Sequence, residues 1–386
     1  MSWKFKIQNL VEDIDNFSDN LRAKLKRIGD FEDDLTIVPY IGYGTTGKFL
    51  LSGRVLEDKG AVFTSGEDSR WNNLQNMYRR FATDEIAGAT VRARFRSIET
   101  EVITDREGYF NLELNRIETI DRESLFHEIE LELLEPMFND GQRACAVGKV
   151  LVPPATAKFG IISDLDDTVI VTNVTNRLKM LLTVALLNEH TRMPFEGVAA
   201  FYKALQKGAT GAENNPIFYV SSSPWNLYSP LTEFLRIQNI PLGTLFLKDF
   251  GSHTIFSSSD HQSHKLNSIE AILNAYPHLP FVLIGDSGEQ DPEIYREVVR
   301  KYPQRIRAIY IRSINTKHER LAAIDKLIGE VSETGCQLVL APDTVYAAVH
   351  AAGESLISTD ALPLIRNEKR EDETAPSAAE ITSEQI

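Results

Sequence analysis

The sequence has few cysteines, no long apolar run and no excess of positive charge, and each shortage excludes a class of protein. Two cysteines among 386 residues provide no disulfide framework, so we expect a reducing cytoplasm. No apolar stretch is long enough to span a bilayer, and the first residues lack the apolar core of a signal peptide. The net charge of −14 argues against nucleic-acid binding and against adhesion to anionic membranes by bulk charge.

Patterning divides the chain into four parts. Apolar residues at helical spacing predict an amphipathic helical segment over 1–35, which packs on the protein, on a partner or on a membrane. Two-faced strands separated by turns predict a small antiparallel β-sandwich, transthyretin-like, over 36–154. Apolar strands alternating with helices over 155–352 predict an α/β fold with a doubly wound parallel sheet. The composition of 353–386 predicts a disordered acidic tail.

A glycine-rich stretch from Gly42 to Lys48 fits nucleotide-binding patterns only in part. A phosphate-binding loop needs Ser or Thr after the lysine, and Phe49 follows here. Both nucleotide-binding motifs also need a helix next, whereas the residues after Lys48 have the composition of a strand. We therefore expect no nucleotide cofactor.

One apolar run ends abruptly in carboxylates. Residues 159–163 predict a buried parallel strand, and Asp164 and Asp166 follow it. Ligands of α/β sheets bind beyond the carboxyl ends of strands, and two carboxylates at this spacing repel unless they share a proton or a cation. A divalent metal is therefore expected, although an acidic turn that caps a helix is the structural alternative.

Three later segments repeat this logic. Ser221 and Ser222 end a predicted strand, where hydroxyls and backbone amides can hold a phosphoryl oxygen or simply cap a helix. Lys265 opens an amphipathic helix, a position that favours a bound anion or is a tolerated surface lysine. Asp286 and Asp291 follow another apolar strand. Coincidence of all four positions is improbable, so we interpret them as one site.

A histidine-rich loop offers an alternative metal site. His253, His261 and His264 lie near Asp260, but their spacing matches no recognised zinc-ligand pattern. We interpret this loop as polar rather than zinc-binding, and its role stays open.

The four segments together resemble the haloacid-dehalogenase-like superfamily of phosphotransferases. Within it, three blocks are similar to the catalytic domain of the actin-patch phosphatidate phosphatase family, which has many bacterial members. They are Asp-Leu-Asp-Asp-Thr from Asp164, Ser-Ser-Ser-Pro-Trp-Asn-Leu from Ser221, and Gly-Asp-Ser-Gly-Glu-Gln-Asp from Gly285, with His264-Lys265 between the last two. The resemblance extends over roughly 150–345.

The resemblance implies a mechanism with an aspartyl-phosphate intermediate. Asp164 is then the nucleophile, and Asp166 is the acid that protonates the leaving oxygen and the base that activates water. The resemblance also implies that Mg²⁺ is held by Asp164, the Asp166 carbonyl and Asp286, and that Asp291 orients its waters. Ser221 and Lys265 then hold the phosphoryl oxygens. The remaining implied substrate-binding residues are Thr168, Ser222 and Trp225.

The length of chain between two site segments bears on the substrate. The interval between Thr168 and Ser221 is too short for a large cap domain, and an open site suits a bulky substrate such as a lipid headgroup at a membrane surface. We expect hydrolysis of phosphatidate to diacylglycerol. The alternatives are a phosphatase for soluble phosphomonoesters or phosphoprotein, and an inactive scaffold module. The oligomeric state and the role of the sandwich stay open.

Overall fold

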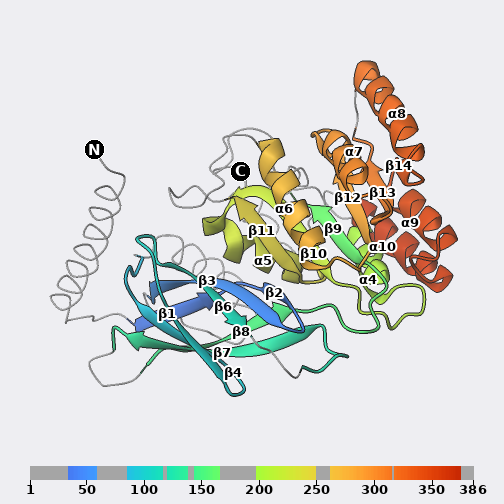
Figure 1. Cartoon of the computed structure of the whole chain (residues 1–386). Helices are drawn as coiled ribbons and strands as arrows, with labels where there is room; N and C mark the ends of the chain where they lie inside the picture. Colours follow the sequence, from blue (N-terminus) through green and yellow to red (C-terminus); the bar gives the residue numbers. More distant parts are fainter. Residues whose placement is uncertain are drawn as a thin grey trace, which may run out of the picture. The chain divides into compact units, whose positions relative to one another are not determined.

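The computed structural model describes two compact units. One contains the described residues up to 120 and 126–150, and the other contains 121–125 and the described residues from 151 onward (Figure 1). Residues 166–196 and residues 1–33 of the predicted N-terminal helical segment lie outside the described chain, which comprises 34–58, 85–115, 120–137, 143–165, 197–248, 261–314 and 317–374. The last two residues of that segment, 34 and 35, belong to a strand.

The first unit is an eight-stranded sheet in the order β1-β3-β2-β8-β7-β4-β5, with β6 also paired to β3. Five of its strand pairs are antiparallel, namely β1–β3, β2–β3, β3–β6, β4–β5 and β4–β7. The strands are β1 (Asp34–Pro39), β2 (Gly42–Thr45), β3 (Lys48–Asp58), β4 (Thr90–Phe95), β5 (Ile98–Ile103), β6 (Tyr109–Asn115), β7 (Phe126–Glu135) and β8 (Cys145–Leu151).

This sheet curls so that one face packs against itself. Phe49 on β3 and Phe95 on β4 have ring centroids 4.9 Å apart, although β2, β8 and β7 separate their strands in the sheet. Strict alternation of apolar and polar residues makes this possible, because every second side chain lies on the buried face. The predicted antiparallel strands are present, but the sandwich of two sheets needs correction. Pairing of β2 with both β3 and β8 joins all eight strands into one sheet.

The glycine-rich stretch is a tight hairpin, as its strand-like continuation predicts. β2 pairs with the start of β3 in the register Tyr43↔Leu50 and Thr45↔Lys48. A Cβ atom at Gly42 would lie 2.1 Å from the Leu50 carbonyl oxygen, and one at Gly44 would lie 2.5 Å from that of Lys48. The glycines thus permit close contact between strands.

The arginine-rich face of β4 is neutralised by its neighbours. Arg92 lies 3.0 Å from Glu101 on β5 and 3.6 Å from Glu132 on β7, and Arg94 pairs with Glu130. These cross-strand pairs favour a solvated sheet face over an anion-binding site.

The second unit is a six-stranded parallel sheet in the order β11-β10-β9-β12-β13-β14 (Figure 1). The chain leaves β9 in one direction towards β10 and β11, then returns to β12 on its other side, so the sheet has a switch point beside β9. The strands are β9 (Gly160–Asp164), β10 (Ile217–Pro224), β11 (Thr244–Lys248), β12 (Phe281–Asp286), β13 (Ile306–Arg312) and β14 (Gln337–Ala341).

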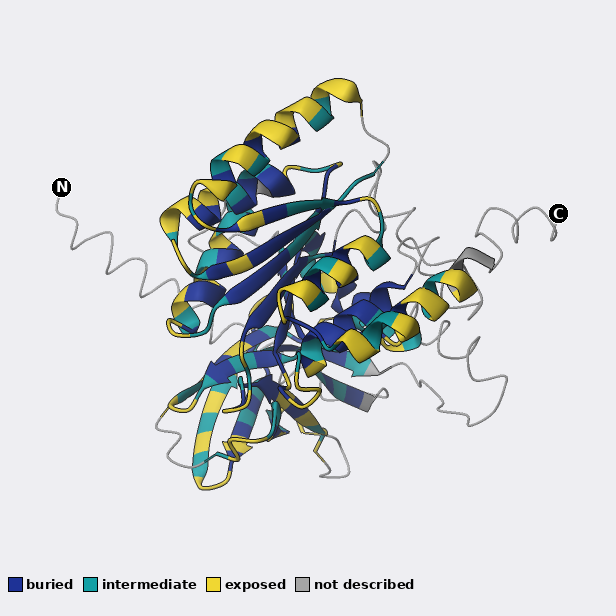
Figure 2. Cartoon of the chain, turned by 90° about the vertical axis from the view of Figure 1, so that its right-hand side faces the viewer, coloured by how far each residue is buried: buried dark blue, intermediate teal, exposed yellow. Residues whose placement is uncertain are grey.

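Helices cover both faces of this sheet (Figure 2). One group that is in mutual contact comprises α4 (Val198–Lys207), α9 (Thr344–Gly353) and α10 (Leu362–Thr374). A second row comprises α6 (His261–Ala275), α7 (Asp291–Lys301) and α8 (His318–Ser332). A 3₁₀ turn η1 (Trp225–Leu227) leads into α5 (Tyr228–Ile237). Among the helices described, none combines the length and apolarity needed to cross a membrane.

The C-terminal part of this unit corrects one prediction. The alternation of strands and helices continues after α8 with β14 and α9, within the predicted span of 155–352. The chain between 354 and 374, assigned to the disordered tail, is ordered: Leu356, Ile357 and Ile365 are buried, and η2 (Thr359–Ala361) leads into α10. Helix α10 is mostly charged, and Ile365 is the buried one among its described side chains, so its composition is similar to that of a solvated tail. Residues 375–386 lie outside the described chain.

Candidate active site

Three carboxylates meet at the carboxyl edge of the parallel sheet. Asp164 ends β9, Asp286 ends the adjacent β12, and Asp291 begins α7. One oxygen of each lies within 4.8 Å of the others, and Asp286 and Asp291 are buried. The strands hold them there because their apolar residues, Ile161 and Val282 among them, are fully buried and fix the register.

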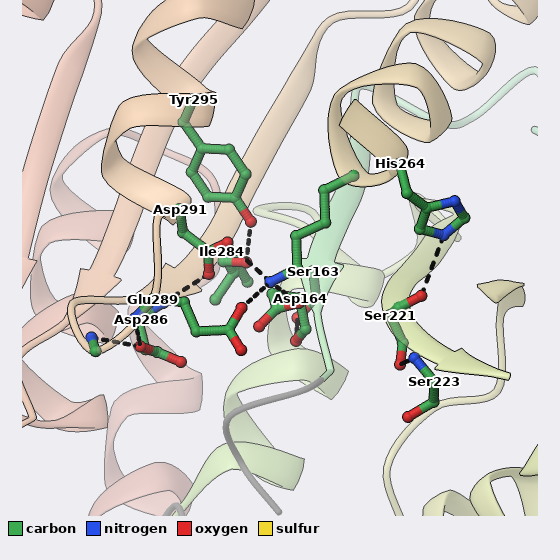
Figure 3. A network of polar contacts seen from close by, with 12 residues as sticks. Ser163, Asp164, Ser221, Ser223, His264, Ile284, Asp286, Glu289, Asp291 and Tyr295 are labelled. Carbon is green, nitrogen blue, oxygen red and sulfur yellow. Dashed lines mark hydrogen bonds and ion pairs between the residues drawn. The ribbon is translucent and has the colours of Figure 1, made fainter. Parts of the chain in front are cut away.

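Lys265 enters this acidic cluster from α6. Its Nζ lies 2.7 Å from Asp164 Oδ1 and 3.2 Å from Asp291 Oδ1, and it also pairs with Glu289 (Figure 3). Helix α6 begins at His261, so Lys265 lies in its second turn rather than opening the helix as predicted. The side chains of Lys265 and Asp164 are each 4% exposed, so these ion pairs are shielded from solvent.

Backbone groups fix the two acids of the β12–α7 loop. Asp286 Oδ1 accepts hydrogen bonds from the amides of Gly288 at 2.6 Å and Glu289 at 3.1 Å. The Asp286 amide donates to Asp291 Oδ2 at 3.1 Å. Gly285 permits this contact, since a Cβ atom there would lie 2.3 Å from Asp291 Oδ2. The loop therefore presents its carboxylates in a fixed arrangement.

The cluster has more negative than positive charge. Asp164, Asp286, Asp291 and Glu289 surround the single ammonium of Lys265. Burial raises the pKa of Asp291 to about 7, the charge of Asp286 acts in the same direction, and Lys265 opposes both. Carboxylate oxygens are the donors that hard divalent cations prefer, so Asp164, Asp286 and Asp291 form a set that fits such a cation.

The serine block lies on the neighbouring strand. Val220 is the register partner of Asp164, and buried Ser221 and partly exposed Ser222 follow it. Strand β10 continues to Pro224, so the serines do not end the strand as predicted. The Ser223 amide donates to Ser221 Oγ at 3.0 Å, so this amide is engaged within the serine block rather than available to a phosphoryl oxygen. In Figure 3 Ser221 and Ser223 lie to one side of the acidic groups.

The remaining predicted residues fall in different places. Trp225 is partly exposed and stacks on Tyr228, with ring centroids 6.2 Å apart. His264 Nε2 lies 3.2 Å from the Ser221 carbonyl oxygen. Asp166, Thr168, His253 and Asp260 lie outside the described chain, as does the side chain of His261.

Several residues at the site were not predicted. Glu289 pairs with Lys265, and its place between two predicted acids was the available signal. Tyr202 on α4 bonds Ser163 Oγ at 2.7 Å, beside Asp164, although its helix has an ordinary core sequence. Arg320 on α8 donates to the carbonyl oxygens of Ser287 at 3.0 Å and Glu289 at 2.5 Å, which fastens the acidic loop to α8.

A pocket adjoins the acidic cluster. Asp164 and Asp286 line it at the sheet edge, while α4, α9 and strands β12, β13 and β14 form its walls. Most of these walls are apolar, and Arg312 and Asp343 are further charged residues among them.

Comparison with known proteins points to one family. Residues 159–313 match the family model described as the catalytic domain of phosphatidate phosphatase APP1. Phosphatidate phosphatase APP1 of Saccharomyces cerevisiae is 35% identical over 157 residues, which are 40% of this chain and 26% of the yeast protein. An uncharacterized protein of Schizosaccharomyces pombe is 28% identical over 235 residues, 61% of this chain and 37% of that protein. The chain thus spans between a quarter and two fifths of these relatives.

Solved structures add no argument about fold or function. A carbohydrate acetylesterase from Xanthomonas citri aligns over 88% of this chain and 75% of its own, with 11% identity and a TM-score of 0.28. Such a score is too low to establish a shared fold. The matched family segment, in contrast, contains all five described residues to which the sequence analysis assigned a catalytic or metal-binding role, namely Asp164, Ser221, Lys265, Asp286 and Asp291.

Proposed function

We propose that this protein is a Mg²⁺-dependent phosphatase of the haloacid-dehalogenase-like type, that it acts on phosphate monoesters, and that phosphatidate is its substrate. The observation that carries the proposal is the buried contact between Lys265 and Asp164, beside Asp286 and Asp291. This cluster lies within the segment similar to the phosphatidate phosphatase catalytic domain. The lipid substrate is inferred from the names of that family and of the yeast relative.

Each residue of the site has its own role in the reaction. Asp164 attacks phosphorus, the bond from phosphorus to the ester oxygen breaks, and the phosphoryl group passes to the carboxylate. Asp166 gives its proton to the leaving oxygen and then removes one from the water that releases phosphate. Lys265 holds a phosphoryl oxygen and keeps Asp164 ionised at 2.7 Å. Ser221 holds a second oxygen from the neighbouring strand.

Asp164, Asp286 and the Asp166 carbonyl would hold Mg²⁺. When bound, this cation would neutralise the negative charge of the phosphoryl group. Asp291 supports this set rather than binding the cation directly. Its Oδ2 accepts the Asp286 amide and its Oδ1 faces Lys265, so both oxygens are engaged in fixing neighbours. Thr168 steadies the loop after Asp164, and Ser222 and Trp225 contact the rest of the substrate.

The test measures phosphate release from dioleoyl phosphatidate in detergent micelles and compares it with release from glycerol 3-phosphate and from a phosphoserine peptide. Each substrate is assayed with Mg²⁺ and with EDTA. Asp164→Asn should abolish release and the phosphoryl adduct seen by intact mass, whereas Asp325→Asn, exposed on α8, should retain both. Release from soluble esters alone would keep the mechanism and discard the lipid. Release that persists in Asp164→Asn would overturn the assigned site. Mg²⁺ binding without release from any of the three would favour an inactive module.

A further inference from the structure

We propose that the pocket between α4 and α9 is the subsite for the part of the alcohol nearest the phosphate, and that it selects esters whose alcohol is apolar there. This inference rests on the proposed phosphatase function and adds the part of the substrate that the acidic cluster does not touch. It accounts for an apolar pocket that the phosphoryl chemistry leaves unexplained.

The pocket and the acidic cluster share two residues. Asp164 and Asp286 belong to the cluster that faces Lys265 and Asp291, and both also line the pocket. A phosphorus atom in reach of Asp164 therefore lies at the pocket's polar end. The ester oxygen and the carbons attached to it must extend away from the cluster, and the pocket provides space for them.

The walls suit carbon rather than charge. On α4, Val198, Phe201 and Tyr202 face the pocket, and their exposed fractions are between 3% and 9%. Ala347 on α9 faces them, and Ile284 and Tyr310 form the side made by the sheet. The Tyr310 hydroxyl bonds His350 at 3.0 Å, so its polar atom is already partnered. An apolar group that binds here moves out of water and into contact with carbon atoms, which is favourable.

The charged wall residues have different roles. Asp343 caps α9 by accepting the Tyr346 amide at 2.8 Å and pairs with Lys369 at 2.7 Å, so its carboxylate is already neutralised. Arg312, the register partner of Asp286 at the tip of β13, is the basic residue among those lining the pocket. Its guanidinium donors suit the carbonyl oxygens of acyl esters near the phosphate. A diacylglycerol phosphate combines these features.

The test compares dihexanoyl phosphatidate with glycerol 3-phosphate. The short-chain lipid dissolves as a monomer below its micellar concentration, so attachment to a surface cannot account for any difference. Ala347→Leu fills the pocket from α9, and the ratio of kcat/KM for the lipid to that for glycerol 3-phosphate should fall at least tenfold. Ala322→Leu makes the same change on an exposed face of α8, outside the pocket, and should leave the ratio unchanged.

Val198→Phe fills the pocket from the opposite wall and replaces Ala347→Leu if that variant does not fold. An unchanged ratio in a folded variant that still hydrolyses both esters would overturn the subsite and leave the proposed function standing. Absence of release from either ester by the unmodified protein would overturn both the subsite and the proposed function.

Arg312→Gln should reduce the preference for the diacyl ester over its dialkyl ether analogue severalfold. An unchanged preference would remove Arg312 from the subsite.

Discussion

The ammonium group of Lys265 lies 2.7 Å from the carboxylate of Asp164, and both side chains are almost fully buried. The two residues are far apart in sequence and come from different layers, one from a helix and one from the centre of the sheet. Their contact supports the proposal that Asp164 is the attacking group. It also makes the pair sensitive to the loss of either charge.

Lys265→Met should leave Asp164, Asp291 and Glu289 without their shared cation. Removal of one partner from a buried ion pair costs about 3–5 kcal/mol, so the free energy of unfolding of the metal-free protein should fall by that amount at alkaline pH. Added Mg²⁺ should recover more stability in this variant than in the unmodified protein. Chemical denaturation with and without Mg²⁺ measures both effects, and phosphate release should fall about 100- to 1,000-fold.

Lys301→Met provides the control for Lys265. Lys301 pairs with Glu270 at 2.6 Å, but its side chain is 58% exposed. Exposed pairs contribute about 0–1 kcal/mol, so this variant should be nearly as stable and as active as the unmodified protein. Equal losses in the two variants would contradict a special role for the buried lysine.

Binding of Mg²⁺ should depend on pH through Asp291. Burial raises the pKa of this carboxyl group to about 7, so at lower pH it holds a proton in the metal-free cluster, and the charge of a cation bound by its neighbours favours loss of that proton. The affinity should therefore rise about tenfold per pH unit below 7 and level off above it. Calorimetric titrations in buffers of different ionisation enthalpy measure the affinity and the proton released.

Asp291→Asn removes the titrating group and should flatten this pH dependence, while Asp325→Asn should retain it. A pH-independent affinity in the unmodified protein would contradict the prediction, as would binding without proton release below pH 7.

Gly285→Ala should disable the acidic cluster without adding or removing charge. The new Cβ atom would lie 2.3 Å from Asp291 Oδ2 and 2.7 Å from its Cγ, so the Asp291 side chain must move away from the Asp286 amide. Mg²⁺ affinity and turnover should both fall, as measured by titration and phosphate release. Gly329→Ala on α8, where no atom lies within 4 Å, should instead stabilise the protein by about 0.5–1 kcal/mol. Unchanged affinity in Gly285→Ala would show that Asp291 need not hold its position.

Tyr202 is a positioning residue for the end of β9. Ser163 has one hydroxyl proton and donates it to the Asp164 carbonyl oxygen at 2.9 Å, so Tyr202 must donate to Ser163 at 2.7 Å. Tyr202→Phe removes this bond, and the free energy of unfolding should fall by about 1 kcal/mol. Because Asp164 is then held less firmly, kcat for glycerol 3-phosphate should fall severalfold with little change in KM.

Tyr219→Phe separates this positioning effect from a loss of stability. Tyr219 is also buried, and its hydroxyl donates to the Pro241 carbonyl oxygen at 2.7 Å, away from the acidic cluster. We expect a similar loss of stability and an unchanged kcat. A parallel decrease of kcat in both variants would assign Tyr202 a merely structural role.

The sequence predicts the parallel strands and their acidic ends well, because β9 and β12 are largely buried and therefore begin with consecutive apolar residues. The change from apolar to acidic residues then marks where each strand meets solvent or a ligand. Strand β14 carries a weaker form of this signal, a short apolar run after Cys336, and α10 carries almost none. Of the α10 residues whose side chains are described, Ile365 is the buried one, and the composition of the helix is mostly charged.

The partners of Lys265 could not be predicted in the same way. Glu289 and Asp291 are 24 and 26 residues away from it, and they approach it only because β12 places their loop beside α6. The pocket has the same origin, since α4 and α9 both line it from distant parts of the chain. Sequence periodicity identifies which face of a helix is buried, but the identity of the neighbour depends on sheet order.

The family match ends at residue 313, whereas β14, α9 and α10 follow it. A protein shortened to 159–313 would present β13 as an edge strand, with the backbone groups that now pair with β14 open to other chains. It would be prone to aggregate and would also lack Ala347 on the pocket wall. Domain boundaries drawn from the matched segment alone would therefore yield an insoluble fragment, and expression should extend at least through α10.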